Sequence, residues 1–332
     1  MKLMDLTANL PHAESRGTGN PEITGIAFDS RRVGGGELFV CLVGLASDGH
    51  DFAAAAVSDG APALVVQRFL DDLDVPQVRV ADSREALARL AAVHQGHPSR
   101  RLKVIGVTGT NGKTSVTRIL GDIARAAGRR SDVFGTLGNT VGGVERVTGF
   151  TTPEAPDFQR LLRESADAGM EWVAMEVSSH ALDQRRVFAT DYAVVVFTNL
   201  SRDHLDHHGT HEAYFEAKRR LFTAAGRGSE SIPVAVIAID DPAGQKLWDD
   251  LDDPRVSFGF SPRAASSTAR VTGPHSDPCS VPQTRHSLLP NQVAGVPGTT
   301  EEIELSSIPK SFQSIRNTRF DSPSPQALLR VS

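Results

Sequence analysis

The fold is decided by residues 106–115, which read Gly-Val-Thr-Gly-Thr-Asn-Gly-Lys-Thr-Ser and follow an apolar run at 102–107. Glycines allow the backbone to approach a polyphosphate closely, so that amide N–H groups and the start of the next helix can surround it. Lys113 adds a positive charge, and Thr114 adds a hydroxyl that can bind Mg²⁺. The stretch therefore predicts a phosphate-binding loop. It is a variant of the general pattern, because Val107 stands where that pattern has glycine.

The sequence around this loop predicts a mostly parallel sheet. Apolar runs at about 102–107, 171–177, 191–198 and 233–239 alternate with helical stretches. Strands that are apolar on both faces are typical of parallel sheets with helices on both sides. We therefore assign residues 99–262 to a central α/β domain of the P-loop type.

Two further zones flank this domain. Residues 1–98 carry short apolar runs, turn signals and an alanine-rich helix at 83–94, which predict a small α/β domain. Residues 263–332 contain 12 Ser and 8 Pro and show no sustained period of 2 or 3.6. Such a composition buries too little apolar surface to offset the entropy lost on ordering, so we predict a disordered tail.

Composition narrows the class of protein. The 332 residues are 39% hydrophobic and 23% charged with a formal charge of −5, which is ordinary for a globular chain and gives no electrostatic reason to bind nucleic acid. Cys41 and Cys279 are far apart, which favours a reducing cytoplasm over a disulfide scaffold. No apolar run approaches the roughly 18 residues of a membrane span. We expect a cytoplasmic, monomeric protein.

A helix is predicted to begin near residues 151–154, Thr-Thr-Pro-Glu. With Thr152 as N-cap and Pro153 as the first helical residue, capping alone explains this sequence. The same geometry also offers hydroxyls and free N–H groups to an anion. Both interpretations stay open.

Candidate metal ligands follow two predicted strands. Glu176 lies at the carboxyl end of one of them, where doubly wound sheets bind ligands, so it is either a Mg²⁺ ligand or a solvated loop carboxylate. Residues 198–208 gather polar groups that include His204, His207 and His208. Three histidines suggest a transition metal, yet their spacing matches no common zinc pattern.

The helix predicted at 211–222 has a lysine on its apolar stripe. Lys218 lies four residues after Tyr214 and four before Phe222. Desolvation there would lower its pKa and make a neutral amine available for covalent chemistry or a specific charge partner. The alternative is a side chain that extends its ammonium into water.

These motifs, and their order along the chain, resemble those of the Mur ligase family. The resemblance rests on the phosphate loop, the turn at 151–153, the run 175–182 with Gln184 and Arg186, the segment 198–206 and the helix 214–222. In the first domain, residues 28–31, 36–40 and 48–50 resemble the uridine-binding domain of the family's tripeptide-forming branch. The resemblance covers about residues 1–262. It implies that residues 1–98 form a UDP-muramoyl-binding domain.

The resemblance implies an ATP-dependent, amide-forming ligase of peptidoglycan precursor synthesis. Such an enzyme activates UDP-N-acetylmuramoyl-L-alanyl-D-glutamate as an acyl phosphate and joins it to a diamino acid, meso-diaminopimelate or L-lysine. The residues implied to bind ATP are Gly109, Thr110, Asn111, Gly112, Lys113, Thr114 and Ser115. Those implied to bind Mg²⁺ are Thr114, Glu176, His204 and a carbamylated Lys218, and the last three act in catalysis with Lys113. Substrate contacts are implied for Ser30, Thr151, Thr152, Ser178, Gln184 and Arg186.

The sequence departs from the family after about residue 262. Nothing in residues 263–332 resembles the family's C-terminal domain or its Asp-Asn-Pro-Arg signature, which selects the added amino acid. We therefore expect a truncated or frame-shifted chain that binds UDP-muramoyl dipeptide but turns over slowly or not at all. Two alternatives stay open. One is a non-catalytic remnant that binds the dipeptide and ATP; the other is a folylpolyglutamate synthase, which is expected to lack the first domain.

Overall fold

The structure, a computed structural model, describes residues 1–259 apart from 45–46, 147–150, 204 and 253. These residues all belong to one unit, Met1–Gly273. The tail predicted at 263–332 therefore lies outside the described residues, and so does His204.

An eight-stranded sheet carries the phosphate loop. Its order is β13-β12-β11-β6-β10-β7-β8-β9; the strands from β13 to β7 are parallel, and β8 and β9 are antiparallel to their neighbours. The strands are β6 (Lys103–Thr108), β7 (Ser131–Gly135), β8 (Gly138–Val141), β9 (Val144–Arg146), β10 (Trp172–Glu176), β11 (Val194–Phe197), β12 (Val234–Ala238) and β13 (Arg255–Phe258). The mostly parallel sheet predicted from the sequence is confirmed.

The sequence predicted four of these strands, β6, β10, β11 and β12, and missed the others. In β7 the reason is Asp132, a fully buried carboxylate at the second residue of the strand. It accepts hydrogen bonds from the backbone of Gly142 and Gly143 and from the Ser165 hydroxyl. These partners satisfy the buried charge, but they lie too far along the chain for a local pattern to reveal them.

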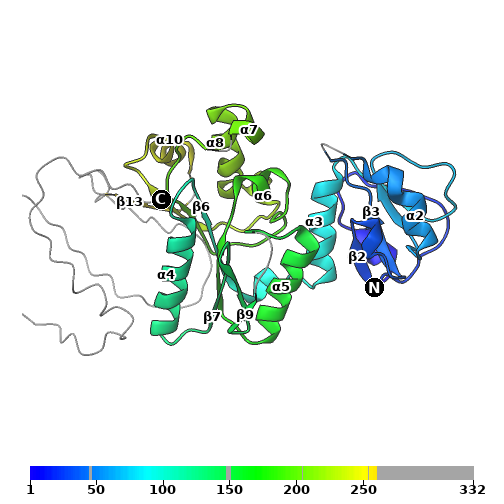
Figure 1. Ribbon diagram of the computed structural model, residues 1–332, viewed down its shortest axis with the longest axis horizontal. Coiled ribbons are helices and arrows are strands. Elements are labelled where there is room, and N and C mark those ends of the chain that lie inside the picture. Colours follow the sequence, from blue (N-terminus) through cyan, green and yellow to red (C-terminus); the bar gives the residue numbers. More distant parts are fainter. Residues whose placement is uncertain (45–46, 147–150, 204, 253, 260–332) are drawn as a thin grey trace, which may run out of the picture. The chain divides into compact units, whose positions relative to one another are not determined.

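Helices cover both faces of this sheet. Val104 and Ile105, successive residues of β6, belong to apolar clusters on opposite faces. On one face α4 (Lys113–Ala126) packs Val116 and Leu120. The other is covered by α5 (Ala155–Asp167), α8 (His211–Arg219) and α10 (Pro242–Asp250). Figure 1 shows strands of the sheet between α4 and α5. Shorter elements are α6 (Ser179–Asp183), α7 (Leu205–His208), α9 (Ala224–Arg227), η3 (Pro98–Arg101) and η4 (Arg220–Phe222).

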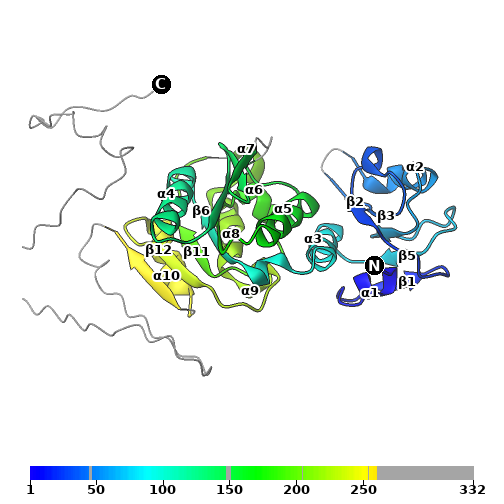
Figure 2. The ribbon, with the colours of Figure 1, turned by 90° about the horizontal axis from the view of Figure 1, so that it is seen from below.

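A second, five-stranded sheet lies within residues 1–98. Its order is β1-β5-β4-β3-β2, with β1 antiparallel and the others parallel, and Figure 2 shows it beside α1 and α2. Asp82 caps the helix predicted at 83–94 by accepting from Arg84 N and Glu85 N. The elements are α1 (Leu3–Thr7), β1 (Glu14–Arg16), β2 (Gly25–Ala27), η1 (Ser30–Arg32), β3 (Glu37–Val40), η2 (Gly49–Phe52), α2 (Ala53–Ser58), β4 (Leu64–Val66), β5 (Gln77–Arg79) and α3 (Ser83–His94).

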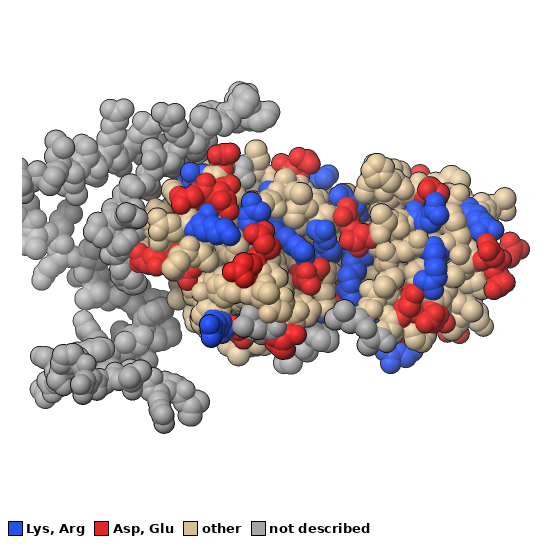
Figure 3. Space-filling model, turned by 90° about the horizontal axis from the view of Figure 1, so that it is seen from above, with Lys and Arg blue, Asp and Glu red and all other residues tan. Residues whose placement is uncertain are grey.

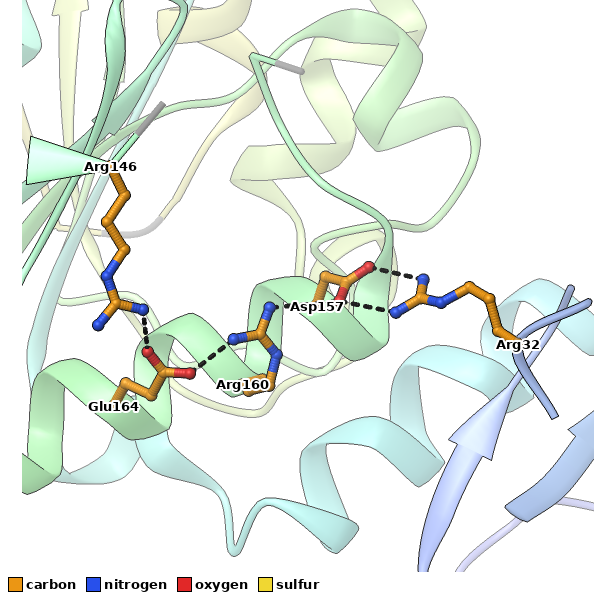
Figure 4. Close-up of polar contacts among 5 residues, drawn as sticks. All are labelled: Arg32, Arg146, Asp157, Arg160 and Glu164. Atoms are coloured by element: carbon orange, nitrogen blue, oxygen red, sulfur yellow. Dashed lines mark hydrogen bonds and ion pairs between the residues drawn. The ribbon is translucent and has the colours of Figure 1, made fainter. Parts of the chain in front are cut away.

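Helix α5 connects the two sheets through ion pairs (Figure 4). Arg32 donates to both carboxylate oxygens of Asp157, at 3.0 and 3.3 Å. Arg160 bridges Asp157 to Glu164, which also accepts from Arg146 of β9. Exposed pairs of this kind contribute about 0–1 kcal/mol each. Ala155 of α5 also packs in one apolar cluster with buried residues of α3.

The charged side chains are mixed in sign. On the face drawn in Figure 3, Lys and Arg alternate with Asp and Glu over the described part of the chain. Among the described residues, no helix is both long enough and apolar enough to cross a membrane.

Candidate active site

The phosphate loop joins the end of β6 to the start of α4 at the carboxyl edge of the central sheet. Gly109 has φ +148°, and a Cβ atom built there would lie 1.9 Å from Thr198 Oγ1. Only glycine fits that contact and this backbone conformation without strain. Gly112 is the N-cap of α4 with φ +84°. The loop is therefore shaped by its two glycines at the position the sequence predicts.

The segment after β11 holds the loop in place. Asn199 accepts from Thr110 N through its carbonyl and from Asn111 N through its side chain. Thr198 Oγ1 donates to Asn111 O at 2.7 Å, and Ser201 N donates to Thr110 Oγ1 at 2.9 Å. These bonds orient the loop backbone before any ligand binds. They also give part of the polar segment at 198–208 a structural function that the sequence did not reveal.

Lys113 lies folded over its own loop. Its Nζ donates to Gly109 O at 2.9 Å and to Thr110 O at 2.8 Å. Burial lowers the pKa of Lys113, and the negative charges of Glu176 and Asp203 act in the opposite direction. Glu176 therefore lies close enough to interact with this ammonium.

Glu176 is a buried carboxylate, 2% exposed, at the last residue of β10. It accepts from Thr136 N at 2.8 Å and from Thr136 Oγ1 at 3.1 Å. A Cβ atom at Gly135 would lie 2.2 Å from Glu176 Oε1, so the glycine makes room for the carboxylate. The interpretation of Glu176 as a solvated loop residue is wrong.

Thr152 does not cap the helix that follows it, which corrects the prediction. Helix α5 begins at Ala155 with Glu154 as N-cap and Pro156 in the first turn. Thr152 Oγ1 donates instead to Glu176 O at 3.1 Å, and Thr151 Oγ1 lies 3.1 Å from Thr136 Oγ1. A second proline allows the helix to start later, so both threonines face the sheet edge.

Helix α6 and the residues after it form another wall of the site. Ser178 caps α6 by accepting from Ala181 N. Arg186 donates to Gln184 Oε1 and to Thr152 O, and its Nε lies 3.0 Å from Glu154 Oε1. The guanidinium is thus held in one orientation by groups on two segments.

Lys218 is buried, with 1% of its surface exposed. Its Nζ donates to Gly109 O at 2.9 Å and lies 4.4 Å from the ring centroid of Tyr214. Burial, with a contribution from the positive charge of Lys113, lowers the pKa of Lys218 to about 7. The alternative in which its ammonium extends into water is therefore wrong, and the desolvated interpretation is confirmed.

A cavity of about 400 Å³ brings many of these side chains together. Six predicted site residues line it: Lys113, Thr151, Thr152, Ser178, Arg186 and Lys218. Four further lining residues were not predicted as site residues: Thr136, Ser179, His180 and Tyr214. Thr136 follows β7 at the carboxyl edge of the sheet, so recognition of that strand would have identified it.

Other predicted site residues do not line this cavity. Gln184 accepts a hydrogen bond from Arg186, and Glu176 accepts one from Thr136; Arg186 and Thr136 both line the cavity. Ser30 belongs to η1, in the N-terminal part of the chain. The other residues predicted to bind ATP lie in the phosphate loop or in the first turn of α4: Gly109, Thr110, Asn111, Gly112, Thr114 and Ser115.

Comparison with protein families gives two matches. The family model of the Mur ligase middle domain matches residues 107–299, and the model described as Mur ligase family, catalytic domain, matches residues 22–95. The first match covers more than half of the 332 residues.

Curated proteins with similar sequences are ligases of the same family. The UDP-N-acetylmuramoyl-L-alanyl-D-glutamate–2,6-diaminopimelate ligase of Geobacillus kaustophilus is 48% identical over 262 residues, 78% of this chain and 53% of that enzyme. The ligase of the same name from Geobacter metallireducens is 43% identical over 278 residues, with 82% and 54% coverage. The chain spans about half the length of the curated relatives it matches.

Solved structures agree with these relatives. A structure of UDP-N-acetylmuramoyl-L-alanyl-D-glutamate–2,6-diaminopimelate ligase aligns with a TM-score of 0.60 at 31% identity, covering 71% of this chain and 48% of that one. MurF from Acinetobacter baumannii aligns with a TM-score of 0.52 at 24% identity over 77% and 52%, which shows a shared fold. With this fold, and with the middle-domain match over the phosphate loop, Glu176 and Lys218, the chain belongs to the Mur ligase family.

Proposed function

We propose that the chain binds ATP and UDP-N-acetylmuramoyl-L-alanyl-D-glutamate and activates the dipeptide for ligation to a diamino acid, in cytoplasmic peptidoglycan synthesis. The observation that carries this proposal is the cavity into which Lys113, Arg186 and Lys218 all open. A phosphate-binding lysine and a fixed guanidinium on one cavity suit a reaction between a polyphosphate and a carboxylate. The names of the relatives support the same substrate.

ATP would bind along the loop from Gly109 to Ser115. There the N–H groups at the start of α4 suit phosphate oxygens, and Lys113 would exchange its two loop carbonyls for phosphate. In the reaction, a substrate carboxylate oxygen attacks the γ-phosphorus and ADP leaves. The amine then attacks the acyl carbon, loses a proton, and inorganic phosphate leaves. Bound Mg²⁺ would neutralise charge on the transferred phosphoryl group.

The chain's own residues fit Mg²⁺ only if Lys218 changes its charge. Glu176 and Thr114 offer oxygen ligands, but Lys113 and Lys218 both donate to the same atom, Gly109 O. Carbamylation would turn the Lys218 ammonium into a carboxylate-like ligand, which Mg²⁺ prefers, and would remove the repulsion between the two lysines. We therefore propose one Mg²⁺ at Thr114 and Glu176 and a second at Glu176, His204 and carbamylated Lys218.

The dipeptide would lie against the walls formed by Thr151, Thr152 and Ser178, with Arg186 on its carboxylates and Gln184 holding Arg186. Ser30 would contact the uridine part. Among the described residues, we assign none to holding the diamino acid. Because an acceptor must lie within about 3–3.5 Å of the acyl carbon, we expect this chain by itself to form little tripeptide.

The test is a phosphate-release assay on the full chain with ATP, Mg²⁺ and UDP-muramoyl dipeptide, run with and without each diamino acid. We expect dipeptide-dependent ATP hydrolysis that the amino acid changes little. Calorimetry with a non-hydrolysable ATP analogue should show binding that Lys113→Ala removes. Lys103→Ala is the matched control, because Lys103 is exposed at the opposite end of β6.

Unchanged nucleotide affinity in Lys113→Ala would contradict the phosphate-loop assignment. Nucleotide binding without any effect of the dipeptide would contradict the substrate assignment. Rapid tripeptide formation, identified by mass spectrometry, would show that the chain positions the acceptor amine itself.

A further inference from the structure

A cluster of one carboxylate and three imidazoles adjoins the cavity, which one of the imidazoles, His180, lines, and the cluster has no assigned part in the proposed reaction. Asp183 is the last residue of α6, and His207 and His208 end α7. One ligand atom from each of these three side chains lies within 4.8 Å of the others. His207 Nε2 is 3.2 Å from Asp183 Oδ2. The ring of His180 packs on His207 with centroids 4.1 Å apart.

Neighbouring groups contact these three side chains and orient them. Arg220 donates to Asp183 Oδ1 at 2.8 Å, while the other oxygen faces His207. His208 Nε2 lies 3.0 Å from Ser179 Oγ. Outer contacts of this kind orient the ligands of metal sites. The Asp183 and His207 side chains are 39% and 18% exposed, so an ion can reach them from solvent.

Two interpretations of the cluster compete. Ion pairs of Asp183 with Arg220 and His207 explain the carboxylate and one imidazole, but they give no reason for His208 to lie beside them. In a tetrahedral zinc site, bonds of about 2.0–2.1 Å place ligand atoms roughly 3.3–3.4 Å apart. The pair His207 and Asp183, at 3.2 Å, is close to this spacing, and a ligand atom of His208 lies within 4.8 Å of both.

We propose that Asp183, His207 and His208 form a binding site for a divalent transition metal of the Zn²⁺ class. Imidazole ligands favour such ions, whereas Mg²⁺ prefers oxygen ligands, so this site is chemically distinct from the one proposed at Thr114 and Glu176. The proposal does not rest on the ligase activity. A bound ion would link α6 to α7 and stiffen the wall that contains Ser178.

The probe is Co²⁺, whose visible absorption reports its coordination geometry. The full chain is titrated with Co²⁺ in excess Mg²⁺, and we expect a saturable band of a four- or five-coordinate ion that one equivalent of Zn²⁺ displaces. Loss of outer contacts alone weakens metal sites by about 10–100-fold, so His207→Gln and Asp183→Asn should each weaken Co²⁺ binding at least about tenfold. His211→Gln, which changes an exposed histidine of the next helix, should leave the band unchanged.

Absence of the band would overturn the proposal, as would a band that survives both variants. A band with a thiolate charge-transfer component would place the ion on a cysteine and would also overturn it. Thermal melts of each variant accompany the titration. His207 is partly exposed, so His207→Gln keeps the test decisive if Asp183→Asn fails to fold.

Discussion

The phosphate loop and helix α8 each place a lysine on the same carbonyl oxygen, but the two lysines come from different parts of the chain. Lys113 reaches Gly109 O from four residues away, whereas Lys218 reaches it from 109 residues away. Lys113 belongs to a loop motif that any strand–loop–helix unit can carry. Lys218 owes its environment to Tyr214 and to the packing of α8 on the sheet. The position of Lys113 in its loop is therefore defined by local sequence, and the desolvation of Lys218 by its tertiary contacts.

The largest effect should come from a substitution of Gly109, the residue whose carbonyl oxygen accepts from both lysines. In Gly109→Ala the new Cβ meets Thr198 Oγ1 at 1.9 Å and the backbone of Asn199 at 3.1 Å, with φ at +148°. We expect a loss of about 3 kcal/mol in the free energy of unfolding, measured by urea denaturation, because steric overlap adds to backbone strain. Gly112→Ala is the matched control. Gly112 has positive φ, but a Cβ atom added there would meet no other atom within 4 Å. The substitution should therefore lower the free energy of unfolding by only about 1 kcal/mol. Equal losses would contradict the steric explanation.

An intermediate effect should follow from the charge of Lys218. Its folded-state pKa of about 7 lies below the ordinary value of 10.5. Below pH 7 the lysine is protonated in both states, and the full cost of burying the charge is present. This cost decreases as pH rises and is gone above the unfolded-state pKa. In buffer free of CO₂, Lys218→Met should therefore stabilise the chain at pH 6 by roughly 2 kcal/mol.

The advantage of Lys218→Met should shrink between pH 7 and 9, as measured by chemical denaturation at several pH values. The control is Lys103→Met, at an exposed lysine on β6. A pH-independent difference would contradict the assigned cause. Bicarbonate added to the wild-type chain tests the proposed carbamate separately, because ¹³C-bicarbonate should give a lysine carbamate signal that Lys218→Met lacks.

The smallest effect concerns the contact between α8 and the loop. The Tyr214 hydroxyl lies 3.3 Å from Thr110 Oγ1. Tyr214→Phe keeps the ring beneath Lys218 and removes this hydrogen bond, so we expect a loss of about 1 kcal/mol in the free energy of unfolding. Thr110→Val should cost less in the Tyr214→Phe background than in the wild-type chain, because there it removes only the contacts of Thr110 Oγ1 with Ser201. A double-mutant cycle with no coupling would show that the hydroxyl acts elsewhere.

Local patterns predicted part of the site well and part of it badly. The loop was predicted correctly because its glycines, lysine and helix start are contiguous. Thr152 was assigned to the wrong helix position, because Pro153 and Pro156 offer two possible starts and only packing selects between them. Thr136 was missed with β7, whose buried Asp132 is satisfied by residues 10 to 33 positions away. Errors of this kind arise where a distant partner decides a local feature.

The sequence by itself determined the family resemblance, the alternation of strands and helices, and the phosphate loop, because these depend on residue type and spacing within one segment. Tertiary structure alone decided that Glu176 is buried against Thr136 and that Lys218 loses its water. It also brought Asp183 to His207 and His208. The physical reason is common to all three. Desolvation and ligand geometry depend on which groups surround a side chain, and those groups come from other strands and helices.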